Sequence, residues 1–305
     1  MKTGSFDFYI NVIEVIHILR GGEFMYETVS NATIMGMAIS MVIAILFPTI
    51  LLVYWQISKK PKFISAVLGA LTFVLAALIL EQILHTVVMM AIGKGDMVAG
   101  QSILSSNVWI YGLYGGLCAA VFEEFGRFIA MKFCMKNFLD KNNAIMYGIG
   151  HGGIEAIIIL GLAEISNIAT SIAINSGSID TILSAVPEGQ REALYEQISA
   201  LWTTPSANFY YAGVERVIAV TLHICLSYLV YRFVKYNEKK LFGAALGIHF
   251  LADFATVVIS RYASIAVVEI VLAIVVVVFL IFTIKMFKNE NSEEQIDNSI
   301  LANVE

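Results

Sequence analysis

The chain is dominated by seven long apolar runs that are separated by shorter polar stretches. They cover residues 33–54, 63–92, 108–133, 147–174, 209–234, 241–260 and 262–287. A transmembrane helix needs about 20 predominantly apolar residues, so each run is long enough to cross a bilayer. The pattern predicts an all-α, polytopic membrane helix bundle with about seven transmembrane helices.

The polar stretches predict the domain boundaries and the orientation. Residues 1–32 are expected to form an N-terminal extracytoplasmic or interfacial segment, residues 33–287 a membrane-embedded domain, and residues 288–305 a disordered, acidic cytoplasmic tail. Residues 175–208 are the only long loop, and residues 188–201 within it could form a surface helix. Lysines follow the first, third and fifth runs, which by the positive-inside rule places these ends in the cytoplasm. We therefore expect a multi-pass protein of the cell membrane with its N-terminus outside and its C-terminus in the cytoplasm.

Composition supports the membrane class and argues against one kind of partner. Hydrophobic residues make up 58% of the 305 positions and charged residues only 14%, against roughly 25% charged residues in soluble domains. The formal net charge of −5 leaves no basic footprint, so we expect no nucleic acid partner. Three cysteines, Cys118, Cys134 and Cys225, form no paired motif and indicate neither a disulfide framework nor a thiolate zinc site.

The third apolar run contains charged residues, which are energetically costly inside a membrane helix. Glu123, Glu124 and Arg127 lie inside residues 108–133. An ionisable group near the middle of a membrane helix costs at least about 2.5–3.5 kcal/mol, so such groups usually face a protein interior and mark function. Glu123 and Arg127 are four residues apart and are expected to pair on one helical face, which leaves Glu124 without an obvious intrahelical partner.

Other ionisable residues reach nearly the same depth from neighbouring helices. His151 and His249 each follow a lysine-rich boundary by some eight residues, or about 12 Å of helix, and His223 lies at a similar depth to Glu123 and Glu124. The same runs also carry Glu155, Glu215, Arg216 and Asp253. We therefore expect the third to sixth helices to enclose one polar site.

A carboxylate and an imidazole in a low-dielectric cavity can activate water. A buried glutamate becomes an effective general base near neutral pH, and a nearby histidine can position the water or stabilise an oxyanion. The sequence contains neither a Gly-x-Ser-x-Gly motif nor a His-Glu-x-x-His motif. These residues therefore favour hydrolysis by a route other than a serine nucleophile or the common zincin signature.

Three motifs in order carry a resemblance to a known superfamily: Glu123-Glu124-x-x-Arg127, Tyr147-x-x-x-His151 and His249-x-x-x-Asp253. They resemble those of the CAAX prenyl endopeptidase and bacteriocin-processing (CPBP) membrane proteases. The Gly-His-Gly-Gly-x-Glu block at 150–155 and the Glu-Arg…His block at 215–223 look more like the bacterial YhfC-type branch. The resemblance implies a protease-like domain in which a glutamate and His151 activate water, while His249 and Asp253 help to hold the oxyanion.

The spacing leaves the choice of base and the need for a metal open. The superfamily has three residues between its second glutamate and its arginine, whereas here two separate Glu124 from Arg127. Either Glu123 or Glu124 could therefore take the catalytic place, and we take Glu124. His151, His223 and His249 with Glu124 could alternatively hold zinc in an open three-ligand arrangement.

We predict an intramembrane endopeptidase that hydrolyses a peptide bond with glutamate- and histidine-activated water and without a cofactor, acting on a peptide or membrane-protein substrate in the lipid bilayer. The predicted catalytic residues are Glu123, Glu124, His151, His249 and Asp253, with Arg127, Glu155, Glu215, Arg216 and His223 in support. A zinc-dependent protease is one alternative. A proton- or cation-coupled transporter that uses the same residues is another, and a non-enzymatic membrane scaffold or immunity partner is a third.

Overall fold

The computed structural model describes residues 26–302, and its regular elements there are all helical. Much of the predicted N-terminal segment, residues 1–25, lies outside the described residues. The helices are α2 (Asn31–Lys59), α3 (Ile64–Phe73), α4 (Glu81–Ile92), α5 (Met97–Ser105), α6 (Val108–Ile129), α7 (Lys141–Ala156), α8 (Leu162–Asn175), α9 (Ile179–Ser184), α10 (Glu188–Thr203), α11 (Ser206–Tyr236), α12 (Lys239–Ser260) and α13 (Ile265–Ala302). Two π-helical segments, η1 (Val74–Leu80) and η3 (Ile157–Gly161), join consecutive helices without a break, and a third, η2 (Ala130–Cys134), extends the end of α6.

Within the described residues, six helical segments are long and apolar enough to cross a membrane. They are Asn31–Lys59, Ile64–Ile92, Lys141–Asn175, Ser206–Tyr236, Lys239–Ser260 and Ile265–Glu290. Helix α6 also has the required length, 22 residues, but it carries Glu123, Glu124 and Arg127. The prediction of an all-α membrane bundle is confirmed, and α6 stands apart by its buried charges.

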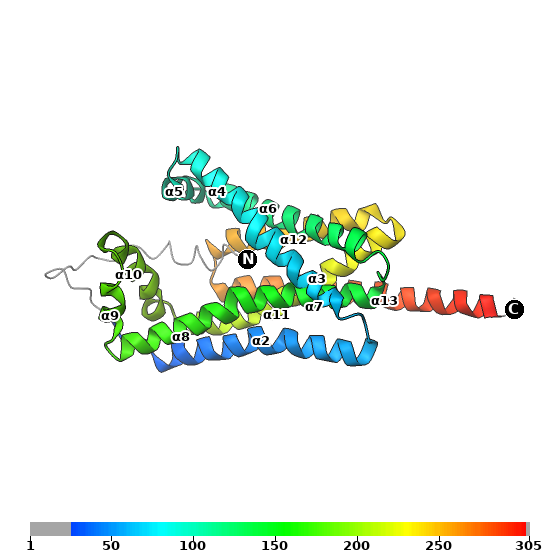
Figure 1. Ribbon diagram of the computed structural model, residues 1–305, viewed down its shortest axis with the longest axis horizontal. Helices are drawn as coiled ribbons and strands as arrows, with labels where there is room; N and C mark the ends of the chain where they lie inside the picture. Colours follow the sequence, from blue (N-terminus) through cyan, green and yellow to red (C-terminus); the bar gives the residue numbers. More distant parts are fainter. Residues whose placement is uncertain (1–25, 303–305) are drawn as a thin grey trace.

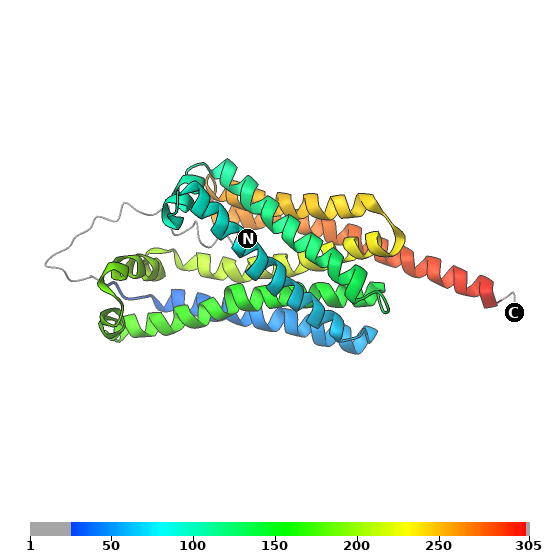
Figure 2. The same cartoon turned by 45° about the horizontal axis from the view of Figure 1, so that its top comes forward.

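Helix α11 forms the centre of the bundle. Two thirds of its most apolar stretch, 67%, is buried, against 22–39% for the other five apolar segments. It packs against α2, α7, α12 and α13, while α6 lies along α12 (Figures 1 and 2). Helices α3 and α7 cross closely, and beyond the crossing α4 and α8 diverge towards the same end of the bundle (Figures 1 and 2). Side chains on the inner faces of α6, α7, α11 and α12 are thereby directed towards one interior region.

Two glycines around His151 allow the helices to approach one another there. A Cβ atom on Gly150 would lie 2.1 Å from the carbonyl oxygen of Ala66 in α3. A Cβ atom on Gly152 would lie 3.0 Å from Cα of Val220 in α11. Small residues at such crossings bring membrane helices into close contact, as the sequence predicts for this segment. His151, between the two glycines, is therefore held in the tightly packed interior.

The long loop and the connection before α6 contain additional helices. Helix α10 confirms the predicted surface helix, and α9 precedes it. Helix α5 was not predicted, although Asp96 gives a recognisable start signal because its side chain accepts hydrogen bonds from the backbone N–H groups of Val98 and Ala99. These short helices lie at one end of the bundle (Figure 1).

Helix α13 continues beyond the apolar span to Ala302, into the segment for which the sequence predicts disorder. Its first turn beyond the span is fixed by a group of residues that we call the clasp: Tyr228, Tyr231, Arg232, Tyr236 and Glu290. The three tyrosine hydroxyls donate hydrogen bonds to the Glu290 carboxylate at 2.5–3.0 Å. These contacts with α11 explain why the helix does not end with its apolar residues.

Candidate metal and catalytic site

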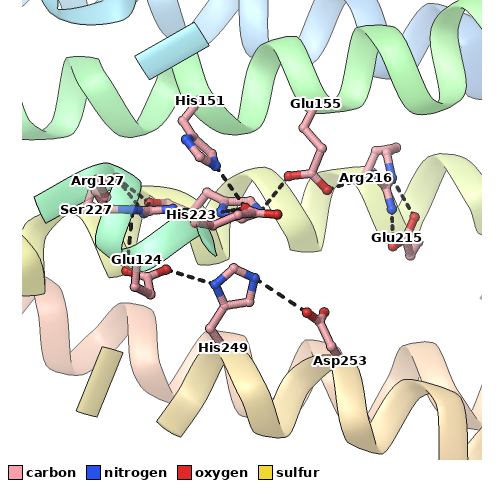
Figure 3. A network of polar contacts seen from close by, with 11 residues as sticks. Glu124, Arg127, His151, Glu155, Glu215, Arg216, His223, Ser227, His249 and Asp253 are labelled. Atoms are coloured by element: carbon pink, nitrogen blue, oxygen red, sulfur yellow. Dashed lines mark hydrogen bonds and ion pairs between the residues drawn. The ribbon is translucent and has the colours of Figure 1, made fainter. Parts of the chain in front are cut away.

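Four helices contribute the buried polar side chains that the sequence predicts to converge. Helix α6 supplies Glu123, Glu124 and Arg127, α7 supplies His151 and Glu155, α11 supplies Glu215, Arg216 and His223, and α12 supplies His249 and Asp253. All except Glu215 are at least 95% buried. Figure 3 shows these side chains meeting between the helices. The structure therefore brings the predicted site residues together.

Glu123, His151, Glu155 and His223 form what we call the central cluster. One potential ligand atom from each lies within 4.8 Å of those from the other three. The Nε2 atom of His151 is 3.0 Å from Oε2 of Glu123, and the Nε2 atom of His223 is 2.6 Å from Oε2 of Glu155. Two imidazoles and two carboxylates thus face one small volume.

A second group, which we call the flanking triad, lies beside the central cluster and consists of Glu124, His249 and Asp253. His249 Nδ1 lies 2.8 Å from Oε1 of Glu124, and its Nε2 lies 3.5 Å from Oδ2 of Asp253. The His249 ring is centred 5.3 Å from the ring of His223, which in turn is 4.9 Å from the ring of His151. The three imidazoles therefore connect the flanking triad to the central cluster.

Arg127 joins these two groups from α6. Its Nε lies 3.4 Å from Oε2 of Glu124, and its Nη1 donates to the backbone oxygen of His223 at 2.9 Å and to Oγ of Ser227 at 2.8 Å. Its Nη2 is 3.1 Å from Nδ1 of His223. Arginine can only donate, so Nδ1 accepts in this arrangement, and the Nε2 proton can be donated to Glu155. Sequence reasoning missed Ser227, although its position four residues after His223 puts the two on one helical face.

Glu155 is held from its other side by a cation. Arg216 Nη1 donates to Oε1 of Glu155 at 3.2 Å, and Arg216 also forms a two-pronged pair with its neighbour Glu215 (Figure 3). Glu269 of α13 is also buried, within electrostatic range of Glu215 and Arg216. The polar network therefore extends from the central cluster across α11 to α13.

The structure corrects two predictions about the site. The expectation that Glu124 lacks an intrahelical partner is wrong, because a spacing of three residues brings Arg127 against Glu124 while Glu123 faces His151. The metal set proposed from sequence included His249 and Glu124, whereas the group of donors that the structure brings within ligand distance contains Glu123 and Glu155 in their place. The helix rotations direct His249 towards Glu124 and Asp253 instead.

A separate polar pair lies on α4. His85 Nε2 lies 3.1 Å from Oε1 of Glu81 on the preceding helical turn, and Nδ1 lies 2.8 Å from the hydroxyl of Tyr114 in α6. This imidazole is half-buried and lies outside the central cluster, so it provides a histidine against which the candidate site can be compared.

The donor set of the central cluster fits zinc. Imidazole nitrogen and carboxylate oxygen are both common zinc ligands, and catalytic zinc sites often use two histidines and a glutamate with one position left open. The central cluster contains two histidines and two glutamates from three helices. It therefore contains such a set and one further carboxylate. Carboxylate–arginine contacts of the kind that Glu155 makes with Arg216 orient ligands in metal sites.

Comparisons with known proteins agree with this donor chemistry. Residues 43–277 match the family described as YhfC intramembrane metalloprotease. The chain is 34% identical over 260 residues to the uncharacterized membrane protein YhfC of Bacillus subtilis (strain 168), an alignment that covers 84% of this chain and 97% of the relative. No solved structure matches. The more specific of the two sequence resemblances is thus confirmed, the wider CPBP relationship stays a prediction, and the chain belongs to the YhfC intramembrane metalloprotease family.

Proposed function

We propose that this protein is a zinc-dependent endopeptidase that cleaves a peptide or membrane-protein segment within the bilayer. The observation that carries the proposal is the central cluster, in which two imidazoles and two carboxylates from three helices lie within ligand distance of one another. The family description supports a metal-dependent protease over the metal-free mechanism expected from sequence. An ion of this kind acts as a Lewis acid and lowers the pKa of the water it carries to about 7.

His151, His223 and Glu155 are the residues proposed to hold the ion. Arg216 bonds Glu155, and Arg127 bonds the backbone oxygen of His223, so neighbouring cations hold the positions of two of the three. A neutral His223 that bound the ion through Nε2 would carry its proton on Nδ1, so the contact between Nδ1 and Arg127 Nη2 would have to open. Holding ligands in place by such neighbours typically changes metal affinity by roughly 10–100-fold.

Glu123 is the proposed general base. Its Oε2 atom lies in the central cluster, where a water between the cluster and a substrate would be within reach. Glu124, which the sequence analysis took as the base, is engaged by Arg127 on one oxygen and by His249 on the other. Both oxygens of Glu124 are therefore occupied by groups outside the central cluster, whereas Oε2 of Glu123 lies beside His151 within it. Glu124 is therefore assigned to orienting His249.

His249 is the proposed donor to the developing oxyanion. Its Nδ1 is engaged by Glu124, whereas its Nε2 lies 3.5 Å from Asp253, so the Nε2–H group is the one that could turn from Asp253 to an oxyanion. Its ring centre is 5.3 Å from that of His223, so a scissile carbonyl beside the central cluster would lie close to it. The flanking triad then stabilises charge, while the central cluster activates water.

Peptide cleavage in reconstituted membranes tests the proposal. Purified protein in proteoliposomes is incubated with a library of hydrophobic peptides, and products are identified by mass spectrometry before chelation, after chelation and after zinc is restored. We expect cleavage that chelation removes and zinc restores. Cleavage that survives complete metal removal would support the metal-free glutamate mechanism instead. Absence of cleavage together with zinc-independent cation flux would favour the transporter.

A further inference from the structure

A basic cavity lies at the lysine-rich end of the bundle, apart from the central cluster. It has a volume of about 260 Å³. Its lining residues are Met131, Lys132, Lys136, Leu139, Val234 and Lys235. Among the described residues that line it, three are cationic and none is acidic. The cavity thus combines a concentrated positive charge with apolar lining residues.

The ammonium groups of the three lysines have hydrogen-bond donors available to a ligand. Lys132 Nζ lies over the ring of Phe128 at 5.0 Å, a contact through the ring face that leaves ammonium hydrogens free. Lys235 Nζ is 3.5 Å from the carbonyl oxygen of Leu139, at the limit of hydrogen bonding. Lys136 is exposed. An anion entering the cavity could therefore accept hydrogen bonds from several ammonium groups.

The location favours a lipid over a free ion. The lining also contains Met131, Leu139 and Val234, of which Met131 and Leu139 are at least 92% buried and contribute little surface. The cavity lies where α6 and α11 leave the apolar core, at the end of the bundle that lysines mark as the cytoplasmic side. Pockets for drug-sized molecules are roughly 300–1,000 Å³, so a smaller headgroup is the size that this cavity accommodates.

We propose that this cavity binds the phosphate headgroup of an anionic lipid. The phosphate oxygens accept hydrogen bonds from Lys132 and Lys136 on one wall and from Lys235 on the other. Each juxtamembrane lysine raises the affinity for an anionic headgroup by roughly fivefold. Three lysines in one cavity therefore predict a preference well above that of an isolated surface lysine.

The proposed ligand would join the two helices that carry much of the central site. Lys132 lies in η2, which begins three residues after Arg127, and Lys235 lies eight residues after Ser227 on α11. Arg127 and Ser227 are themselves bonded across the interface between α6 and α11. A phosphate between the lysines would hold the ends of the same two helices together. Lipid binding is therefore expected to raise the thermal unfolding midpoint in a concentration-dependent way.

Native mass spectrometry of the detergent-solubilised full chain tests this proposal. The protein is titrated with dioleoyl phosphatidylglycerol, with dioleoyl phosphatidylcholine and with inorganic phosphate, and thermal unfolding is measured in parallel. The cavity variant carries Lys132→Gln, Lys136→Gln and Lys235→Gln. The control variant carries Lys59→Gln, Lys239→Gln and Lys240→Gln, which remove three exposed lysines outside the cavity lining. The two variants therefore have the same net charge.

We expect phosphatidylglycerol to bind at least about tenfold more tightly than phosphatidylcholine, with the preference and the thermal shift lost in the cavity variant and kept in the control. Equal loss in both variants would overturn the proposal in favour of a general attraction to basic residues. Equal binding of the two lipids would also overturn it. Displacement of the lipid by inorganic phosphate at comparable concentration would identify a small-anion site instead.

Discussion

Two buried polar groups lie along α11, the central cluster and the clasp, and they differ in what they present to a ligand. In the clasp, three tyrosine hydroxyls donate to one carboxylate, Glu290, which also lies 3.6 Å from Arg232. In the central cluster, two imidazoles and two carboxylates face one another within 4.8 Å. The clasp therefore satisfies itself with hydrogen bonds, whereas the central cluster concentrates lone pairs that suit a cation.

Burial of polar groups alone thus does not mark a functional site. The carboxylates of both groups are buried, although Tyr236 at the edge of the clasp is exposed, and both groups connect helices that are distant in sequence. Carboxylates that accept several hydrogen bonds inside a protein stabilise the fold, and removing a partner leaves a costly unsatisfied group. The comparison predicts that substitutions in the central cluster abolish metal binding and activity, and that substitutions in the clasp reduce stability alone.

The largest expected effect is that of removing a ligand. His151→Ala should abolish zinc binding and peptide cleavage, because the proposed ion loses one of three protein ligands. Zinc content by elemental analysis and cleavage in proteoliposomes measure both. His85→Ala is the control, since it removes a half-buried imidazole that bonds Glu81 and Tyr114 outside the central cluster. If His85→Ala loses as much zinc as His151→Ala, the assignment of the central cluster is wrong.

The two adjacent glutamates should differ in the next experiment. Glu123→Gln should lower the rate of cleavage by roughly 10²–10⁴-fold, because general-base catalysis contributes about that much and an amide cannot accept the proton. Glu124→Gln should lower it by roughly 10–100-fold, because the change disturbs the orientation of His249 and the ion pair with Arg127 but leaves the proposed base in place. Both proteins should retain zinc. An active Glu123→Gln beside an inactive Glu124→Gln would restore Glu124 as the base.

A smaller effect is expected one contact away from the proposed ion. Arg216→Gln removes the cation that bonds Glu155 and should weaken zinc affinity by roughly 10–100-fold. Competition with a zinc chelator of known affinity measures the change. Arg191→Gln is a suitable control, because Arg191 lies on α10, away from the central cluster, and donates to the backbone oxygens of Ser184 and Val186. If Arg216→Gln and the unchanged protein bind zinc with equal affinity, the assignment of Glu155 to the metal site is contradicted.

The clasp should show the smallest effect on function. Glu290→Gln should lower the free energy of unfolding by about 1–3 kcal/mol, because the tyrosine hydroxyls lose a charged acceptor. Zinc content and cleavage should be unchanged at temperatures where the protein is folded. Glu238→Gln provides a milder control, since Glu238 bonds Arg232 but is 36% exposed. Loss of zinc in Glu290→Gln would contradict the division between the two regions.

The sequence predicted the bundle and the depth of the site but not the partners within it. Runs of apolar residues fix the spans, and helical rise places His151 and His249 at one depth. Glu123 and Glu124 are adjacent, so about 100° of helical rotation separates their side chains and each faces a different neighbour. Only the packing of α6 against α7 and α12 determines that Glu123 meets His151 and Glu124 meets His249.

Contacts between distant segments explain the remaining differences. Glu290 lies at the start of an acidic stretch for which composition predicts disorder, yet it meets Tyr228, 62 residues earlier on α11. Glu155 enters the metal set because α7 approaches α11 through Gly152, a proximity that spacing along one helix does not reveal. Local signals such as the Asp96 cap were present and could have identified α5.

The measurement that tests the central claim most directly is zinc K-edge X-ray absorption on the purified protein, with the metal content determined in the same sample. We predict about one zinc ion per chain, with nitrogen and oxygen ligands only, at about 2.0–2.2 Å, and a weaker imidazole contribution from any zinc that His223→Ala retains. A protein that is fully active without zinc or another divalent metal would contradict the claim. So would a bound ion whose ligand shell is unchanged in His223→Ala.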